Sequence, residues 1–486
     1  MKKFRILSLL LALALLLSLS AFAASGEASG EVSGGASMGP ASLTWEQSAE
    51  LSRQSAALWQ NSGKNSYEHG VILSDENDYT AVFAEGGELT VADYTIATTG
   101  REAQSPNTTM HFADANFYGT AAAVLAGQGA LLRLTDSSVI TAGEGANGVF
   151  SYGGTVYLED VHVACFGKEN AHGIDAVQNG AIYGEDIWVY TSGINSGVAA
   201  TDTGGGYIEL KDSSLSSAMA PGVYMDGQGV AKFENVTVQV GVDKDGSPVT
   251  EMYMTNSGAD GVAEEMKENT AEGLVLTGDA QITAVDTEVS APYGVKFHSQ
   301  SSTTQIGVLS MNGGSIRSTA YDVIYVTGAN GSGVLDGVRC EAAEGRFLIR
   351  ICNLVPANLA EPGVGAKICA GTGDFTLRGG DYAGDVWALN AAEEESWGAQ
   401  LEEATRFDNS LKLRLEEASW TGAAIHVSEL TLAEGALWTP SGASDIARLT
   451  VEKGAEIQIS AGMSVSVNGE AVTALGAGVY ENVNIG

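Results

Sequence analysis

Apolar and polar residues alternate along much of this 486-residue chain, with the two-residue period of half-buried β-strands. In one segment, for example, Val156 and Leu158 alternate with Tyr157 and Glu159. Gly, Asp and Asn interrupt such segments, and these residues are typical of tight turns. A helical period of 3.6 residues is not seen in them, and the abundant Gly and Thr disfavour helix. The pattern therefore predicts short strands separated by tight turns.

From Ala123 onward, five strand segments begin 24 or 25 residues apart, and a similar segment at Ala81 precedes them after an insertion of about one loop. Two kinds of position recur in these segments. The first is an aliphatic column formed by Val82, Val124, Val149, Ile174, Val198 and Val223. The second is an acidic or amide column, just after an alternating strand, formed by Asp93, Asp136, Asp160, Asp186, Asp212 and Asn235. One repeat of this length cannot bury its own apolar side, so stacked repeats must share a core. We expect an all-β solenoid of stacked parallel strands with rungs of about 24–25 residues.

Composition divides the chain into segments of different character. The first 23 residues combine a basic start, an apolar run and an Ala-Phe-Ala site, which predicts a cleaved export signal. A Gly/Ser/Ala/Glu-rich stretch follows and is typical of a flexible linker. The expected segments are the signal 1–23, the linker 24–42, an N-terminal cap 43–70 with a short amphipathic helix or irregular structure, the solenoid 71–409 with insertions near 101–120, 243–272 and 352–373, and a region of shorter rungs 410–486.

Charge narrows the range of partners. Sixty Asp and Glu against 24 Lys and Arg give a formal charge of −36, which would repel nucleic acid and anionic membrane surfaces. We therefore expect no nucleic-acid partner, no transmembrane anchor, and a secreted, extracellular or cell-surface protein. The four cysteines, Cys165, Cys340, Cys352 and Cys369, leave both disulfides and buried free thiols open.

The two columns resemble those of secreted bacterial proteins with the right-handed parallel β-helix, or pectin-lyase-like, fold. Within that class the chain is most similar to adhesin-like proteins, and its C-terminal rungs resemble the end of autotransporter passenger domains without the barrel that those carry. The resemblance concerns architecture, so it implies a fold and no particular reaction. Enzymes of this class would need clustered carboxylates with arginine or histidine, and among the regular early rungs only Arg133 stands in a strand.

The best candidate for catalysis is the set His172, Asp175 and Asp202, which lie one rung apart and could act as in a polysaccharide hydrolase. The simpler interpretation is that Asn170, His172 and Gly173 form a turn, because Asn and Gly recur at that place in neighbouring rungs. Asp243 and Asp245 resemble part of a calcium loop, for which a hairpin turn is the alternative. No cofactor is expected, and calcium remains an open alternative.

Aromatic residues at successive rungs are candidate contacts for a glycan. The binding candidates are Phe150, Tyr152, Tyr157, Tyr183 and Trp188, for which a place in the core is the alternative. Together these observations favour a secreted, noncatalytic scaffold that adheres to a surface, a glycan or a partner protein. A lyase or hydrolase that acts on acidic polysaccharide is the alternative function.

Overall fold

The structure is a computed structural model that describes residues 43–103, 113–202, 204–256, 263–298, 304–352, 370–390 and 409–486. The predicted export signal, the linker and Cys369 lie outside the described residues, as do parts of all three predicted insertions. The chain forms two compact units. Unit 1 comprises the residues up to Pro221 together with Gly241–Asn269, and unit 2 comprises Gly222–Val240 and Thr270–Gly486.

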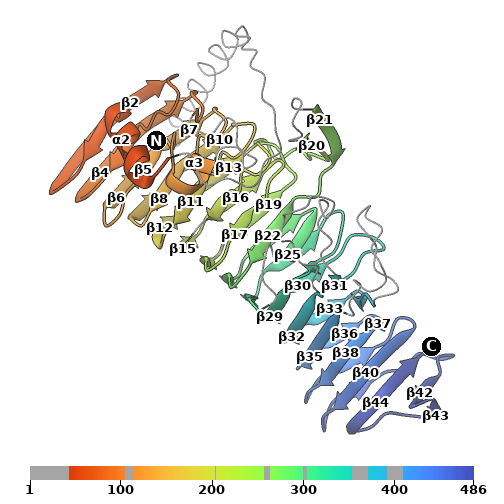
Figure 1. The fold of residues 1–486 in the computed structure, drawn as a ribbon. Helices are drawn as coiled ribbons and strands as arrows, with labels where there is room; N and C mark the ends of the chain where they lie inside the picture. Colours follow the sequence, from red (N-terminus) through yellow and green to blue (C-terminus); the bar gives the residue numbers. More distant parts are fainter. Residues whose placement is uncertain are drawn as a thin grey trace. The chain divides into compact units, whose positions relative to one another are not determined.

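Unit 1 is built from short parallel strands stacked in register (Figure 1). Its first sheet contains, in spatial order, β1 (Leu58–Gln60), β3 (Val82–Ala84), β5 (Val124–Ala126), β8 (Val149–Tyr152), β11 (Ile174–Val177) and β14 (Ala199–Thr201). A second set of stacked strands contains β2 (Lys64–Ser74), β4 (Glu88–Thr98), β6 (Leu131–Thr135), β9 (Thr155–Glu159), β12 (Gly180–Glu185) and β15 (Gly206–Lys211). A third set contains β7 (Ser138–Thr141), β10 (His162–Cys165), β13 (Trp188–Thr191) and β16 (Ser214–Ser217).

Three further elements of unit 1 lie outside its stacked strands. Helix α2 (Trp45–Ser55) begins at Thr44, which forms a capping box with Gln47, and α3 (Ala113–Tyr118) is a short second helix. The antiparallel hairpin of β20 (Glu251–Asn256) and β21 (Ala263–Glu268) falls in the second predicted insertion. None of the helices in the described part of the chain is long and apolar enough to cross a membrane.

Unit 2 repeats the same architecture. Its first sheet contains β17 (Val223–Met225), β22 (Glu272–Thr277), β25 (Tyr293–His298), β28 (Ile324–Thr327), β31 (Ile349–Cys352), β34 (Val386–Ala388) and β37 (Ala424–Ile425). Its second set contains β18 (Val230–Glu234), β23 (Gln281–Val285), β26 (Ile306–Asn312), β29 (Asn330–Asp336), β32 (Thr372–Arg378), β35 (Ser410–Glu416), β38 (Val427–Leu432) and β40 (Ser444–Val451). Its third set contains β19 (Thr237–Val240), β24 (Glu288–Ala291), β27 (Ser315–Ser318) and β30 (Arg339–Glu341).

The C-terminal part of unit 2 has shorter rungs, as the sequence predicts. Leu413, Leu430 and Leu449 are in register although only 17 and 19 residues separate them. A small parallel sheet of β33 (Asp381–Ala383), β36 (Ser419–Thr421), β39 (Leu437–Thr439) and β41 (Glu456–Ile457) accompanies these rungs. The last segments are not further rungs, because β42 (Val465–Val467), β43 (Glu470–Val472) and β44 (Gly478–Ile485) pair antiparallel and close the edge of β40.

The predicted all-β parallel β-helix is therefore confirmed, with one correction to the aliphatic column. Val82, Val124, Val149 and Ile174 lie side by side in register, as expected. Ile174, however, pairs with Ala199 and not with Val198. The Ile174 N–H donates to the carbonyl of Val198. In parallel strands an N–H bonds to the carbonyl of the residue that precedes its register partner, so the partner of Ile174 is Ala199.

The acidic column forms the corner between the second and third strand sets of unit 1. Asp93, Asp136, Asp160, Asp186 and Asp212 all adopt left-handed backbone conformations, with φ between 49° and 54°. Asp and Asn tolerate this conformation better than other residues with a side chain. The N–H of Asp136 donates to the carbonyl of Glu159, and the N–H of Asp160 donates to that of Glu185, so each corner is bonded to the next rung.

Candidate functional site

Three tyrosines form a stacked row on the outer side of unit 1, which we call the tyrosine ladder: Tyr157, Tyr183 and Tyr207. They lie on β9, β12 and β15, where their neighbours Val156, Ile182 and Ile208 point into the core. Tyr157 and Tyr183 are direct register partners, with ring centroids 5.0 Å apart and planes 14° apart. The Tyr207 ring lies 5.5 Å from that of Tyr183 and is tilted by 49°.

The surroundings of the tyrosine ladder determine what it can present to a partner. The guanidinium of Arg133 lies 4.3 Å from the centroid of the Tyr157 ring and covers its outer face. The Tyr207 hydroxyl donates to the Glu209 carboxylate. Burial, and to a smaller extent this hydrogen bond, raise the pKa of Tyr207 above its usual range. Because the stacked rings cover each other's faces, the ladder presents mainly ring edges, hydroxyl groups and the tilted ring of Tyr207.

Trp188 lies on β13, across the Asp186 corner from Tyr183. Its ring is half-buried and stacks on that of Tyr190, on the same strand, at 6.0 Å with planes 10° apart. The exposed ring of His162, on the neighbouring strand β10, lies 6.0 Å away. Burial raises the pKa of Tyr190 to about 12. Tyr157, Tyr183 and Trp188 are thus all partly exposed at the surface of unit 1.

Phe150 and Tyr152, in contrast, do not lie at the surface. Phe150 is fully buried and Tyr152 is 8% exposed, because α2 and α3 cover the face of the first sheet to which they belong. The Trp45 ring of α2 stacks on Tyr152 with centroids 4.0 Å apart and planes 6° apart. The prediction that these two side chains face outward for a ligand is wrong, since the strand alternation contains no information about a covering helix.

The structure brings Asp175 close to Asp202 but seals Asp175 from solvent. Asp175 lies on β11, is fully buried, and neither of its carboxylate oxygens has a hydrogen-bond partner among the described residues. Burial, and then repulsion by Asp202, raise the pKa of Asp175 well above its usual range. An acid with a raised pKa suits proton donation, but a polymer cannot reach a side chain that has no exposed surface.

His172 lies in the turn before β11 and is 5% exposed. Its backbone N–H donates to Asn147 Oδ1 at 2.7 Å, and Asn147 Nδ2 donates to the carbonyl of Ala115 in α3. Neither ring nitrogen of His172 has a hydrogen-bond partner among the described residues, and burial lowers the pKa of the ring to about 4. The turn is therefore fixed by its backbone, and the imidazole is neutral at pH 7.

Asp243 and Asp245 lie in a tight turn. Asp243 Oδ1 accepts hydrogen bonds from the backbone N–H groups of Asp245 at 2.9 Å and Ser247 at 2.8 Å. Asp245 pairs with Lys244 at 2.7 Å. These contacts use Asp243 as a turn cap. Over the described ranges, no three His, Cys, Asp or Glu side chains come together as a metal site would require.

The cysteines in the described residues are free thiols. Cys165 and Cys352 are buried, and Cys340 is partly so. Burial raises the pKa of both Cys165 and Cys340 to about 12, which keeps these thiols protonated and unreactive.

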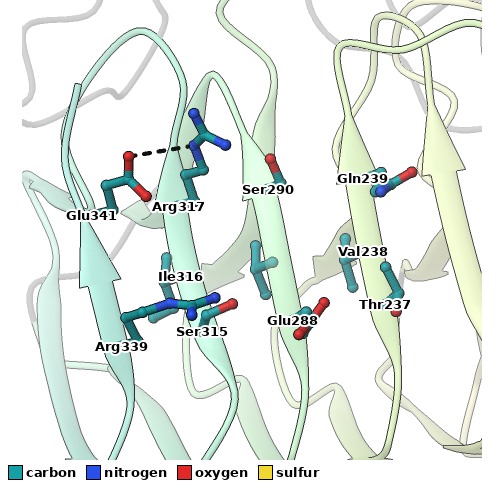
Figure 2. Close-up of a pocket in the computed structure, with 11 residues that line it drawn as sticks. Thr237, Val238, Gln239, Glu288, Ser290, Ser315, Ile316, Arg317, Arg339 and Glu341 are labelled. Atoms are coloured by element: carbon teal, nitrogen blue, oxygen red, sulfur yellow. Dashed lines mark ion pairs between the residues drawn. The ribbon is translucent and has the colours of Figure 1, made fainter. Parts of the chain in front are cut away.

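Sequence reasoning missed a shallow groove on the third strand set of unit 2, with a volume of about 260 Å³ (Figure 2). We call it the arginine groove. Its outward side chains form two register columns, one of Thr237, Glu288, Ser315 and Arg339, and one of Gln239, Ser290, Arg317 and Glu341. The observation that arginine is scarce holds for the early rungs only. The signal available in the sequence was two arginines, Arg317 and Arg339, on consecutive alternating segments.

The fold and these surfaces define the class of protein as a parallel β-helix solenoid. Neither a model of a protein family nor a curated protein sequence matches the chain.

Proposed function

We propose that this protein is a noncatalytic β-helix scaffold that acts outside the cell and binds a glycan or a surface partner through the tyrosine ladder. The observation that carries the proposal is the ladder itself, in which three tyrosines and Arg133 occupy outward positions on consecutive strands. Aromatic side chains concentrated at a surface are typical of binding sites, because they bury a large apolar area and keep a polar group available.

The form of the ladder favours an extended ligand. Tyr157 and Tyr183 are in register on neighbouring strands, which repeat at about 4.8 Å, whereas Tyr207 is offset by two residues because it pairs with Ala181, so the contacts continue diagonally across the strands. Its hydroxyl groups can exchange hydrogen bonds with the hydroxyls of a sugar chain or with an extended backbone. The predicted export signal, which lies outside the described residues, supports a role for such contacts at a cell surface or in the extracellular medium.

The experiment is a binding screen of the mature chain on arrays of glycans and extracellular-matrix proteins. The double variant Tyr157→Ala/Tyr183→Ala should lose binding to any ligand that the wild-type chain captures, by at least tenfold. Tyr480→Ala is the matched control, because Tyr480 lies on β44 in the other unit and its hydroxyl bonds only to the carbonyl of Gly476. Binding that the double variant retains in full would contradict the proposal.

The alternative function is a hydrolase or lyase for acidic polysaccharide, which would need carboxyl groups that a polymer can reach. The pair of Asp175 and Asp202 speaks against it, because Asp175 has no exposed surface. Release of reducing or unsaturated ends from a panel of acidic polysaccharides, abolished by Asp175→Asn, would support this function. No release from any polymer, by a protein that binds glycans, would leave the scaffold function in place.

A further inference from the structure

The arginine groove of unit 2 contains a cation that has no ion-pair partner among the described residues. Arg339 is exposed, and its side chain makes no ion pair and no hydrogen bond with the described residues. Most of the other described arginines of unit 2 are paired; Arg350, for instance, contacts Asp322 at 2.7 Å and Arg378 contacts Glu416 at 2.6 Å. Arg346 also has no ion pair among the described residues, but its guanidinium lies 5.1 Å from the centroid of the Tyr321 ring, a contact that Arg339 does not make with the described part of the chain.

The second arginine of the groove is held only weakly. Arg317 Nε lies 3.6 Å from Glu341 Oε1, and the two side chains are 61% and 60% exposed. An exposed pair at this distance contributes little to stability, so an incoming anion can compete for the guanidinium. Figure 2 shows Arg317 and Glu341 at one end of the groove, with Arg339 extended beside Ser315.

The remaining groups of the groove are hydroxyls, an amide and one more acid. Ser315 is the register partner of Arg339, and Ser290 is that of Arg317. Thr237 and Gln239 follow on β19, the strand next to β24. Hydroxyl and amide side chains both donate and accept hydrogen bonds, as the vicinal hydroxyls of a sugar ring require. The groove thus combines an anion-binding fork with partners for a hydroxylated ring.

The acidic groups limit how many negative charges the ligand can carry. Glu288 and Glu341 line the same groove, and the whole chain has a formal charge of −36. A polyanion would meet repulsion from both, whereas one carboxylate can bind at the guanidinium and keep its distance from the glutamates. The volume of about 260 Å³ suits one or two sugar rings better than a long segment.

We propose that the arginine groove binds a terminal acidic sugar, one carboxylate on an otherwise neutral glycan, with the carboxylate on Arg339 and the ring hydroxyls on Ser290 and Ser315. The planar guanidinium offers two parallel N–H donors that match a carboxylate. The residues of this site differ from those of the tyrosine ladder, and the expected ligand chemistry differs too. Either proposal can therefore be refuted while the other stands.

The test measures binding of sialyllactose, lactose and polygalacturonate to the mature chain by ligand-observed NMR and calorimetry. Sialyllactose should bind, and both lactose and polygalacturonate, compared per sugar residue, should bind at least tenfold more weakly. Arg339→Gln should weaken sialyllactose binding by at least tenfold and leave the tyrosine-ladder ligand unaffected. Arg448→Gln is the matched control, because Arg448 is an exposed arginine of unit 2 that lies on β40, outside the groove.

Circular dichroism and the melting temperature establish that each variant is folded, which is expected because Arg339 and Arg448 are both exposed. Equal binding of lactose and sialyllactose would overturn the proposal, and so would tighter binding of polygalacturonate. Wild-type affinity in Arg339→Gln would overturn it as well, whatever the result for the tyrosine ladder.

Discussion

A single methyl group at Gly173 should force two rungs of unit 1 apart. Gly173 precedes β11, and a Cβ atom built there would lie 2.3 Å from Val189 Cγ1 and 2.6 Å from the carbonyl oxygen of Val198. The valine can rotate, but the carbonyl cannot, because it accepts the N–H of Ile174 at 2.9 Å. An unstrained contact needs about 3.5 Å, so the two backbones must separate by about 1 Å.

The cost of Gly173→Ala follows from these contacts. Overpacking costs about 1–3 kcal/mol, and a weakened backbone hydrogen bond adds about 0.5–1.5 kcal/mol. We therefore expect a loss of about 2–4 kcal/mol in the free energy of unfolding, which lowers the Tm by roughly 5–15 °C in a body of this size. Differential scanning calorimetry of the purified chain measures the shift.

The control is Gly442→Ala. A Cβ at Gly442 meets no atom closer than 3.9 Å, and the backbone there is not left-handed. This variant should keep the wild-type Tm or gain slightly, because alanine restricts the unfolded chain. If Gly173→Ala melts within 1 °C of the wild-type chain, the close approach of β11 to its neighbouring rung, and the register derived from it, would be refuted.

Three further predictions concern the corner, the buried acid and the buried histidine of unit 1. At the left-handed corner, Asp160→Val should lose about 1–2 kcal/mol in the free energy of unfolding, whereas Asp160→Gly should stay near the wild-type value. Urea titrations measure both variants, and equal midpoints would contradict this prediction. Burial raises the pKa of Asp175, so the folded chain keeps a proton that the unfolded chain releases above about pH 4, and the stability of the folded chain falls as the pH rises from there. Asp175→Asn should remove this loss and raise the Tm at pH 7. An unchanged or lower Tm would contradict the argument. His172 acts in the opposite direction, since its pKa of about 4 makes stability fall as pH drops from 6.5 to 4, and His172→Gln should flatten that part of the Tm profile.

Much of the fold was predictable because solenoids repeat their constraints. Every rung of unit 1 needs an aliphatic residue in the first sheet and a residue that tolerates positive φ at the corner, so Val149, Ile174 and Asp160 recur in a recognisable way. The register at Val198 could not be predicted so well. Val198 and Ala199 are both small, apolar and buried, and only the backbone hydrogen bonds decide which of them faces Ile174.

The surfaces were harder to predict than the strands. Alternation correctly placed Tyr157 and Tyr183 outside, because nothing in the described chain covers that face. The same rule failed at Phe150, where α2 and α3 come from 32 or more residues earlier in the chain and cover the sheet. The arginine groove was missed for a related reason, since its eight outward side chains come from four separate strands and no local spacing connects them.

The corner column shows why charge alone is a poor indicator of function in this protein. In unit 1 the corner is aspartate, which suggests a cation site when only the sequence is considered. In unit 2 the corner N–H groups of Asp286, Gly313, Gly337 and Gly379 make the same rung-to-rung hydrogen bonds, and all four residues have positive φ. Glycine can replace aspartate there, so what the corner requires is a backbone conformation and not a carboxylate. The five corner aspartates of unit 1 are therefore explained by turn geometry, and ligand chemistry has to be sought where charged side chains are not needed by the backbone, as at Arg339.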